Sequence, residues 1–302
     1  MTDAYVRTTT AMGTVVTAHV VGRSGSGADR ESSTRRALDW FERVERTCSR
    51  FDPDSELTRL TQHAGEAVRV SDILFEIVRF ALAVAEESDG AFDPTVGRTL
   101  AAAGFDRDYR TGRAIATPTL EEASEYRAIH LDEHEKTVML DRLVSLDLGA
   151  VAKGFAVDLA ARELRENGFH NFVIDAGGDL YVSGHNANDE PWSVGIRHPR
   201  VESEIIETLR LSDVGICTSG DYERVASRST AGVTHHLVDP RTRHSASELA
   251  SVTVIAPGAM IADALSTAVF VLGPVDGIRL LQRQKVDGFV YTTSLERYST
   301  DQ

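Results

Sequence analysis

The strongest chemical signal in the sequence lies between Leu146 and Asp158, in the segment LDLGAVAKGFAVD. Asp147 and Gly149 predict a turn, after which an amphipathic helix is expected to run to about Asn167. Lys153 falls near the start of this helix, where unpaired backbone N–H groups and the helix dipole already make the potential positive. A helix N-terminus, flanking glycines and a lysine together describe a phosphate site. The plainer alternative is a solvated surface lysine.

A second signal lies in the segment MIADALSTAVFVLG, whose apolar residues predict a buried helix over Met260–Leu272. Asp263 lies inside this helix, and a buried carboxylate must be paired, protonated or bound to a metal. Thr267 follows one turn later on the same face. Two oxygen ligands at this spacing suit a hard cation such as Mg²⁺, which also takes phosphate oxygens. Alternatively, Asp263 pairs with a core arginine or caps a neighbouring turn, while Thr267 bonds to its own helix.

Three further clusters carry weaker signals. In AFDPTVG, Asp93 precedes a proline and so lies in a loop, where a carboxylate can be aimed. In DAGGD, Gly177 and Gly178 allow close approach of the backbone to a ligand, although a β-bulge explains them nearly as well. In HHLVDP, His235 and His236 are adjacent; a histidine is more often structural, but one beside a phosphate site can carry a proton.

Bulk properties exclude several classes of function. The chain has 302 residues, a formal net charge of −14 and two cysteines, Cys48 and Cys217. The negative charge argues against a nucleic-acid surface and against docking on anionic lipid. Two cysteines do not form a disulfide framework. The N-terminus shows no apolar signal segment, and no window is expected to reach the length of a membrane span, which predicts a cytoplasmic protein without membrane insertion. The usual nucleotide cradles and zinc motifs are absent from the sequence.

Apolar periodicity predicts the elements that position these groups. Helices are expected over Glu31–Thr47 and over Asp72–Glu87, the second capped by Ser71 and stopped by Gly90. A short apolar strand is expected to end at Leu146, just before the central helix. Further strands are expected over Met12–Val21, in a hairpin within Arg127–Leu146, and over Asn171–Ile174, Leu180–Val182, Trp192–Arg197, Glu204–Leu211, Ser251–Ala256 and Gly288–Thr292. No linker or repeat interrupts this mixture, so one α+β domain is expected.

The order of the motifs resembles the ApbE family of FAD:protein FMN transferases. The similarity runs from about Thr10 to Gly273 and rests on SRFDPDSEL, GAFDPTVG, LDLGAVAKGFAVD, IDAGGDLYVSG, TSGDYER, HHLVDP and ADALSTAVFVLG. It implies an α+β architecture related to tandem T-fold units, in a single compact domain over residues 8–296 with mixed or antiparallel sheets and packed helices. It also implies a Mg²⁺-dependent enzyme that cleaves the diphosphate of FAD, attaches FMN to a threonine or serine of a target protein and releases AMP.

The resemblance also implies roles for individual residues. Asp263 and Thr267 would bind the metal together with the backbone carbonyl of Ala150, and His236 and Asp263 would be the catalytic residues, with His236 assisting proton transfer. The implied contacts with FAD are Met12, Phe51, Ala91, Phe92, Asp93, Asp147, Lys153 and Leu237, to which the glycine pair Gly177 and Gly178 is added. These roles fit the chemistry, because splitting a diphosphate requires neutralisation of charge on its oxygens more than a protein nucleophile.

Two alternatives to flavin transfer stay open: hydrolysis of FAD to FMN and AMP at the same site, and flavin binding without catalysis. The presence of both Asp263 and Thr267 argues against the second, because flavin retention alone needs no metal pair. The chain departs from the family where Arg243 and His244 follow HHLVDPRT, since the family usually has a glycine at the first of these positions. The shape of this loop is therefore expected to differ.

Acceptor proteins of the family resemble a short [DS]-G-A-[ST] motif with a hydroxyl at its last position. The nearest match in this chain is Ser26-Gly27-Ala28-Asp29, in a Gly/Ser loop that is expected to be flexible enough to reach an active site. Its last residue is aspartate, which has no hydroxyl and whose charge repels a diphosphate. The chain is therefore not expected to modify itself.

Overall fold

The computed structural model describes residues 4–115, 125–229 and 232–301. Its centre is an eight-stranded sheet in the order β1-β2-β6-β7-β10-β13-β14-β15, and every neighbouring pair in it is antiparallel. The strands are β1 (Ala4–Ala11), β2 (Thr14–Val21), β6 (Phe172–Ala176), β7 (Asp179–Ser183), β10 (Val214–Gly220), β13 (Leu249–Ala256), β14 (Asp287–Thr292) and β15 (Arg297–Ser299). This antiparallel sheet with packed helices confirms the expected α+β class.

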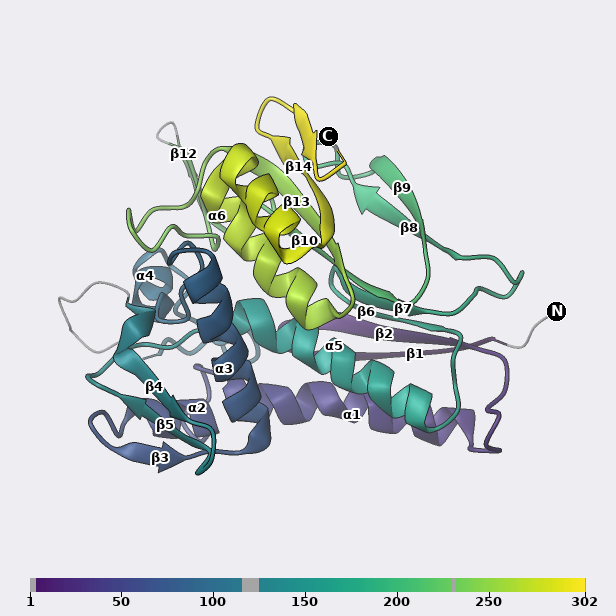
Figure 1. Cartoon of the computed structure of the whole chain (residues 1–302), viewed down its shortest axis with the longest axis horizontal. Coiled ribbons are helices and arrows are strands. Elements are labelled where there is room, and N and C mark those ends of the chain that lie inside the picture. The colour runs from purple at the N-terminus through teal and green to yellow at the C-terminus, as the bar shows by residue number, and fades with distance from the viewer. Residues whose placement is uncertain (1–3, 116–124, 230–231, 302) are drawn as a thin grey trace.

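Helices cover one face of the sheet and a two-stranded ribbon covers the other (Figure 1). Helices α5 (Gly149–Glu166) and α6 (Ala259–Gln284) pack on the sheet and on each other, while α1 (Arg30–Cys48) packs on α5. The ribbon consists of β8 (Trp192–Arg197) and β9 (Ile205–Leu211), and an apolar cluster that includes Trp192, Ile216 and Phe289 joins it to the sheet. The middle strands are buried on both faces for this reason.

A side lobe lies next to the N-terminus of α5 (Figure 1). It contains a three-stranded sheet in the order β3-β5-β4, the long helix α3 (Asp72–Glu87) and shorter helical segments. Its other elements are α2 (Glu56–Thr61), β3 (Ala67–Arg69), α4 (Gly97–Ala102), a 3₁₀ turn (Tyr126–Ala128), β4 (Ile129–Asp132) and β5 (Thr137–Leu140). A separate hairpin is formed by β11 (Val225–Ser229) and β12 (Gly232–His235).

The strongly periodic elements agree with the sequence predictions. Helix α3 has the predicted bounds, and the Ser71 side chain caps it by accepting a hydrogen bond from Leu74 N at 3.3 Å. Helix α5 ends at Glu166, followed by Gly168 in the left-handed conformation with φ 80°. Strand β2 buries Val16, Ala18 and Val20 as the alternation predicts.

Other predictions are wrong in informative ways. The apolar stretch before α5 forms no strand; Leu146 is buried there by packing, without ladder hydrogen bonds. Met12 belongs to the β1–β2 turn, with φ 52°, and not to the strand. The first α6 segment ends near Leu272 as predicted, but Gly273 (φ 81°) and Pro274 only kink the chain, and a second helical segment follows to Gln284.

Helix α6 also corrects the expectation that no window reaches the length of a membrane span. By length and composition, an 18-residue window of α6 qualifies, and 61% of that window is buried inside the protein. Contacts with α5, β10 and β13 cover it. Its apolar character is therefore explained by its place in the core.

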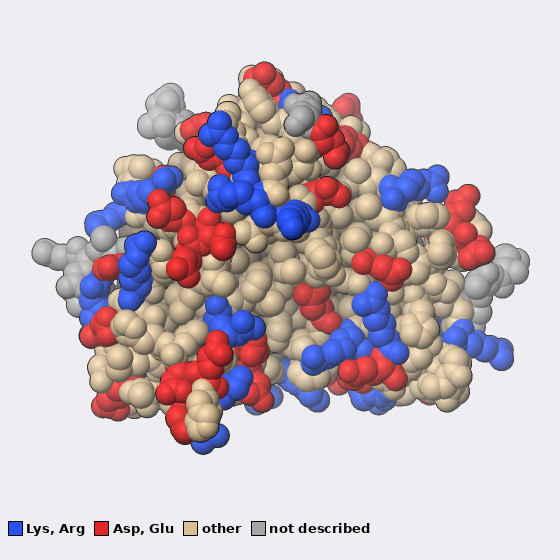
Figure 2. All heavy atoms as spheres, viewed as in Figure 1, with Lys and Arg blue, Asp and Glu red and all other residues tan. Residues whose placement is uncertain are grey.

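On the face in Figure 2, acidic and basic side chains are interspersed with uncharged ones.

Candidate functional site

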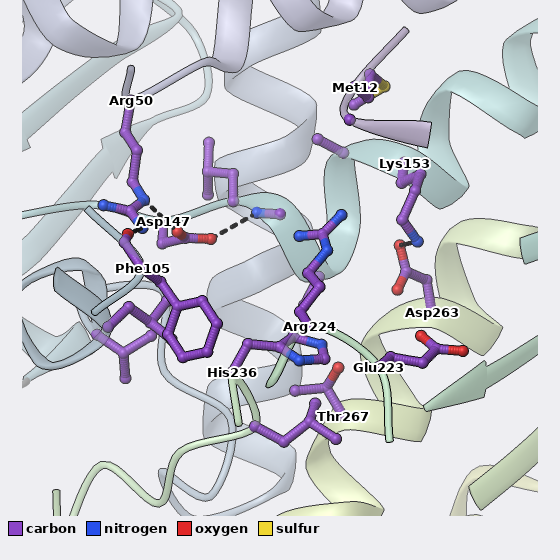
Figure 3. A pocket seen from close by; sticks show the side chains of 18 of the residues that line it. Met12, Arg50, Phe105, Asp147, Lys153, Glu223, Arg224, His236, Asp263 and Thr267 are labelled. Atoms are coloured by element: carbon purple, nitrogen blue, oxygen red, sulfur yellow. Dashed lines mark hydrogen bonds and ion pairs between the residues drawn. The ribbon is translucent and has the colours of Figure 1, made fainter. Parts of the chain in front are cut away.

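A pocket of about 590 Å³ opens where the side lobe meets the N-terminus of α5 and the first half of α6. All predicted site residues except Gly178 line it. Those that do are Met12, Phe51, Ala91, Phe92, Asp93, Asp147, Ala150, Lys153, Gly177, His236, Leu237, Asp263 and Thr267. The close-up in Figure 3 shows side chains from five or more separate segments turned toward this one space. The structure thus brings together residues that the sequence separates by more than two hundred positions.

Asp263 is a buried acid of the pocket, with 5% of the residue exposed. Its Oδ2 accepts a hydrogen bond from Gly154 N at 3.0 Å, in the first turns of α5, and lies 3.9 Å from Lys153 Nζ. Burial raises the pKa of Asp263, and the positive charge of Lys153 opposes this rise. The partner is therefore a lysine and a helix backbone, and not the core arginine of the alternative interpretation.

Thr267 lies one turn further along α6, beside Asp263 (Figure 3). Within the described ranges its hydroxyl forms no hydrogen bond, so it does not bond to its own helix. The neighbouring Ser266 does this instead, because its Oγ donates to the carbonyl oxygen of Asp263 at 2.8 Å. The hydroxyl of Thr267 and the buried carboxylate of Asp263 therefore offer two oxygen ligands to a cation.

These oxygens fit a hard divalent cation. Asp263 would supply a carboxylate, Thr267 a hydroxyl and Ala150 a backbone carbonyl, and all three residues line the pocket. Mg²⁺ is typically held by one or two carboxylates together with water and substrate phosphate oxygens. A site with one carboxylate, in a pocket that a phosphate ligand can enter, therefore suits Mg²⁺.

Lys153 is not a surface lysine, since only 15% of its side chain is exposed. Its ammonium group forms an ion pair with Asp179, at the start of β7, and lies near Asp263. Asp179 is itself only 3% exposed. Sequence reasoning missed this aspartate, although it is the second acid of the DAGGD segment. The lysine is therefore held in the pocket by two carboxylates.

The glycine pair before Asp179 forms a two-residue hairpin turn between β6 and β7. Both glycines have positive φ, 68° for Gly177 and 98° for Gly178, as a tight hairpin turn requires. A Cβ on Gly177 would collide with the side chain of Thr14, whereas Gly178 has open space around it. The pair is thus explained by turn geometry rather than by a bulge, and only Gly177 reaches the pocket.

Two contacts fix α6 against α5 and so place Asp263. A Cβ on Gly154 would lie 2.7 Å from Met260 Cα, so only glycine permits this close approach. Asp158 accepts hydrogen bonds from Ala259 N at 2.7 Å and Met260 N at 3.0 Å, which caps α6 from another helix. Burial raises the pKa of Asp158 to about 6 despite these hydrogen bonds.

Asp147 is held by an arginine that sequence reasoning missed. Its Oδ1 accepts from Gly149 N at 2.9 Å and its Oδ2 pairs with Arg50, which also donates to the carbonyl oxygen of Phe105. The Arg50 guanidinium stacks over the ring of Phe51, 4.3 Å from its centroid. Arg50 thus ties the N-terminus of α5 to the side lobe. In the sequence, Arg50 stands out only because it directly precedes Phe51, a predicted contact with FAD.

Asp93 lines the pocket, but both of its oxygens are already used within the side lobe. Oδ1 accepts from the backbone N and the hydroxyl of Thr95, at 2.8 and 2.7 Å, and Oδ2 accepts from Tyr126 N at 3.2 Å. Burial raises the pKa of Asp93, and these hydrogen bonds oppose the rise. The carboxylate therefore shapes the AFDPTVG loop, whose residues Ala91 and Phe92 face the pocket.

The two adjacent histidines have different surroundings. His235 is structural: its Nε2 contacts the carbonyl oxygen of Ala246 at 2.9 Å, and its Nδ1 accepts from Leu237 N at 3.2 Å. His236 faces the pocket, and its buried Nδ1 has no hydrogen-bond partner in the described chain. Desolvation and the nearby positive charge of Arg224 lower the pKa of His236 to about 3. His236 is therefore neutral at pH 7 and has a ring nitrogen available.

The loop after these histidines forms a closed turn, with Arg243 at the position where the family usually has a glycine. Arg243 adopts φ 63°, the left-handed conformation that glycine favours. Its backbone N donates to the Asp239 carbonyl at 2.8 Å, and Asp239 N donates to the His244 carbonyl at 2.8 Å. The loop thus closes with an arginine in the glycine position, which leaves His236 and Leu237 at the pocket wall.

The buried neutral state of His236 predicts a specific pH dependence of stability. Between pH 6.5 and about 3, the unfolded chain binds a proton at this position and the folded protein does not. The free energy of unfolding should therefore fall as the pH falls through this range, and His236→Gln should flatten that slope. Urea unfolding at pH 7, 6 and 5 measures it. His244→Gln is the control, because His244 is exposed; an equal slope in both variants would contradict the assignment.

Comparison with solved structures supports the fold over the full length. The ApbE protein of Thermotoga maritima superposes with a TM-score of 0.85 at 30% sequence identity, covering 98% of this chain and 96% of that one. A flavin transferase ApbE from Vibrio cholerae gives a TM-score of 0.84 at 27% identity, covering 99% of this chain and 97% of the other.

Sequence comparison gives the same relationship. A protein of Haemophilus influenzae named FAD:protein FMN transferase is 30% identical over 252 residues, 79% of this chain and 72% of the relative. One of the same name from Treponema pallidum is 32% identical over 303 residues, 92% of this chain and 81% of the relative. The model of the ApbE family matches residues 12–290, which include every pocket residue described above. The chain belongs to the ApbE family.

Proposed function

We propose that this chain is a flavin transferase that moves FMN from FAD to a hydroxyl group of an acceptor protein, in a reaction that requires Mg²⁺. The observation that carries the proposal is the convergence of a buried carboxylate, a free hydroxyl and a lysine on one pocket, at Asp263, Thr267 and Lys153. The names of the relatives, FAD:protein FMN transferase, support the flavin chemistry. The requirement for Mg²⁺ and the acceptor hydroxyl group are the parts of the proposal that go beyond the names of the relatives.

The proposed reaction is a phosphoryl-type substitution. The acceptor oxygen forms a bond to the phosphorus of the FMN half, the bond from that phosphorus to the bridging oxygen breaks, and AMP leaves with that oxygen. A ring nitrogen of neutral His236 accepts the hydroxyl proton. A bound Mg²⁺, held by Asp263, Thr267 and the Ala150 carbonyl, would supply neutralisation of the phosphate charge. Lys153 orients the diphosphate from the other side.

The rest of the pocket suits the aromatic parts of FAD. Met12, Phe51, Phe92 and Leu237 line it with apolar surface, and the pocket volume of about 590 Å³ lies in the range of small-molecule sites. We assign these residues to the ring systems and Asp147 to the polar edge of the ligand. Hydrolysis of FAD by the same groups, with water as the acceptor, is the second candidate.

We further propose that the acceptor is a cytoplasmic flavoprotein with a [DS]-G-A-[ST]-like motif. Cys48 and Cys217 are buried free thiols, a state that suits a reducing compartment. Cell fractionation tests the location. Recovery of the protein outside the cytoplasm would contradict it without affecting the flavin chemistry.

One experiment separates the candidate functions. The protein is incubated with FAD, Mg²⁺ and a peptide or protein that carries the acceptor motif, and intact mass and released nucleotide are measured. Added FMN on the acceptor together with AMP supports transfer, and free FMN with AMP supports hydrolysis. FAD that is bound but unchanged supports binding without catalysis. A parallel sample with EDTA should lose the reaction, since the phosphate charge would then lack its main counter-ion; full turnover in EDTA would contradict the Mg²⁺ requirement.

We predict that the chain does not attach FMN to itself. Asp29 lacks a hydroxyl and instead caps α1 by accepting from Ser32 N at 2.8 Å. The loop is also held away from the pocket, because Ser26 donates to the Asn167 carbonyl at 2.9 Å, at the far end of α5. An 18-residue helix spans about 27 Å. This anchoring corrects the expectation that the loop can reach its own active site.

The self-modification prediction has a simple check. Intact mass after incubation with FAD and Mg²⁺ should be unchanged for the natural chain. Asp29→Thr restores an acceptor hydroxyl, and any adduct on this variant should form between molecules, with a rate per molecule that rises with protein concentration. An adduct on the natural chain would show that the acceptor rule is wrong.

A further inference from the structure

The charged groups of the pocket are largely paired with one another. The ammonium group of Lys153 is shared by Asp179 and Asp263, and Arg50 is paired with Asp147. A diphosphate ligand brings two negative charges into this space. The positive charges of Lys153 and Arg50 are already balanced by carboxylates before a ligand binds. These two side chains therefore neutralise the charge of a diphosphate poorly.

Arg224 is not paired in this way. It lines the pocket, and within residues 4–115, 125–229 and 232–301 its guanidinium has no hydrogen-bond or ion-pair partner. In Figure 3 the side chain points into the cavity, with its guanidinium above His236 and between Asp147 and Lys153. Burial and then the positive charge of Arg224 lower the pKa of His236, and the same charge opposes the burial that raises the pKa of Asp263, in agreement with this central position. Arg224 is an exposed residue whose side chain lines the pocket.

The backbone that carries Arg224 is held in an uncommon conformation. Its φ of 35° is rarely adopted by a residue other than glycine. The preceding turn is anchored to the β8–β9 ribbon: Arg200 makes two hydrogen bonds to Asp221, at 2.7 and 2.8 Å, and Arg197 stacks over the Tyr222 ring at 4.3 Å. Strained backbone of this kind persists where surrounding structure enforces it, often at functional sites. Here the anchors aim Arg224 at the pocket.

We infer that Arg224 is a phosphate ligand, which offers a fork-shaped set of donors with no hydrogen-bond or ion-pair partner among the described residues to the diphosphate of FAD. This inference rests on the proposed function. A guanidinium presents parallel N–H donors that match phosphate oxygens, and such charge-assisted hydrogen bonds are among the stronger ones in proteins. Lys153 and Arg224 then hold the diphosphate from two sides, the first buried and shared, the second free.

The test compares FAD with riboflavin, which has the same ring system and no phosphate. Binding is followed by flavin fluorescence with the full chain in EDTA and again with Mg²⁺. The variants are Arg224→Gln, which removes the charge, and Arg224→Lys, which keeps the charge and removes the fork. Arg279→Gln is the matched control, since Arg279 is exposed on the second segment of α6 and pairs with Asp276.

Arg224→Gln should weaken FAD binding at least about tenfold, while riboflavin binding changes less than about twofold. Arg224→Lys should recover part of the FAD affinity, and Arg279→Gln should match the natural chain. Equal losses for FAD and riboflavin would show that Arg224 shapes the pocket without contacting phosphate. Unchanged FAD binding in Arg224→Gln would overturn the inference about Arg224 and leave the proposed function standing. Failure of the natural chain to bind FAD at all would instead overturn the proposed function.

Discussion

Replacing Asp263 by asparagine should reduce flavin transfer at least about a hundredfold and leave the protein folded. The substitution removes the one carboxylate of the proposed cation site, while the amide oxygen can still accept from Gly154 N. Lys153 keeps a partner in Asp179, so no unpaired charge is left in the core. The free energy of unfolding without metal should therefore change by no more than about 1 kcal/mol.

Two measurements check this expectation together. Transfer is followed by the mass of the acceptor, and stability by urea unfolding in EDTA. Asp276→Asn on the same helix is the control, because Asp276 is exposed and pairs with the exposed Arg279. If Asp263 were a structural partner first, its loss would destabilise the protein by about 3–5 kcal/mol. That outcome, or full activity of Asp263→Asn, would refute its assignment to the cation.

Gly154→Ala should damage stability and activity at once. The added methyl group would overlap the backbone of Ala259 and Met260, so α5 and α6 would have to separate. Overpacking of this kind typically costs about 1–3 kcal/mol. The same shift would lengthen the hydrogen bond from Gly154 N to Asp263 and move this carboxylate relative to Ala150 and Lys153. Transfer should fall by about two orders of magnitude, since a displacement near 1 Å has that effect on positioned groups.

Gly25→Ala provides the matched control for the helix contact. A methyl group added at Gly25 would meet no atom within 4 Å, and the residue does not have a positive φ. Its replacement should leave transfer and the unfolding midpoint nearly unchanged. Thermal unfolding measures the stability of both variants, and the mass of the acceptor measures their transfer activity. A Gly154→Ala protein with normal stability and normal activity would show that the close approach of α5 and α6 is not required.

The elements that sequence patterns predict well are those with long, one-sided apolar periodicity. Helix α3 has a capping serine, a continuous stripe and a following glycine, and its predicted bounds agree with the structure. Strand β1 escapes prediction because its residues alternate between exposed and half-buried, without an apolar face that a pattern could reveal. The segment before α5 is wrongly predicted as a strand because burial by loop packing leaves the same apolar residues as a strand.

The site is predictable where it depends on local segments and not where it depends on pairing between them. The central-helix lysine and the late-helix aspartate stand out by type, and the motif order adds Met12, Phe51 and Leu237. The ion pair of Lys153 with Asp179 joins different elements, and no spacing within one segment reveals it. Arg224 escapes prediction for a similar reason, since nothing within its own segment shows that the fold places it at the pocket beside Lys153 and His236.

The hydrogen bond between Gly154 and Asp263 joins residues 109 positions apart, and the cap from Asp158 to Ala259 spans 101. Such long separations place a contact late in folding, because a long loop must close first. A chain that is still being synthesised therefore has no flavin pocket until α6 has left the ribosome. A ligand that binds only the native state stabilises only that state, so FAD can protect the finished enzyme but not its nascent or truncated forms.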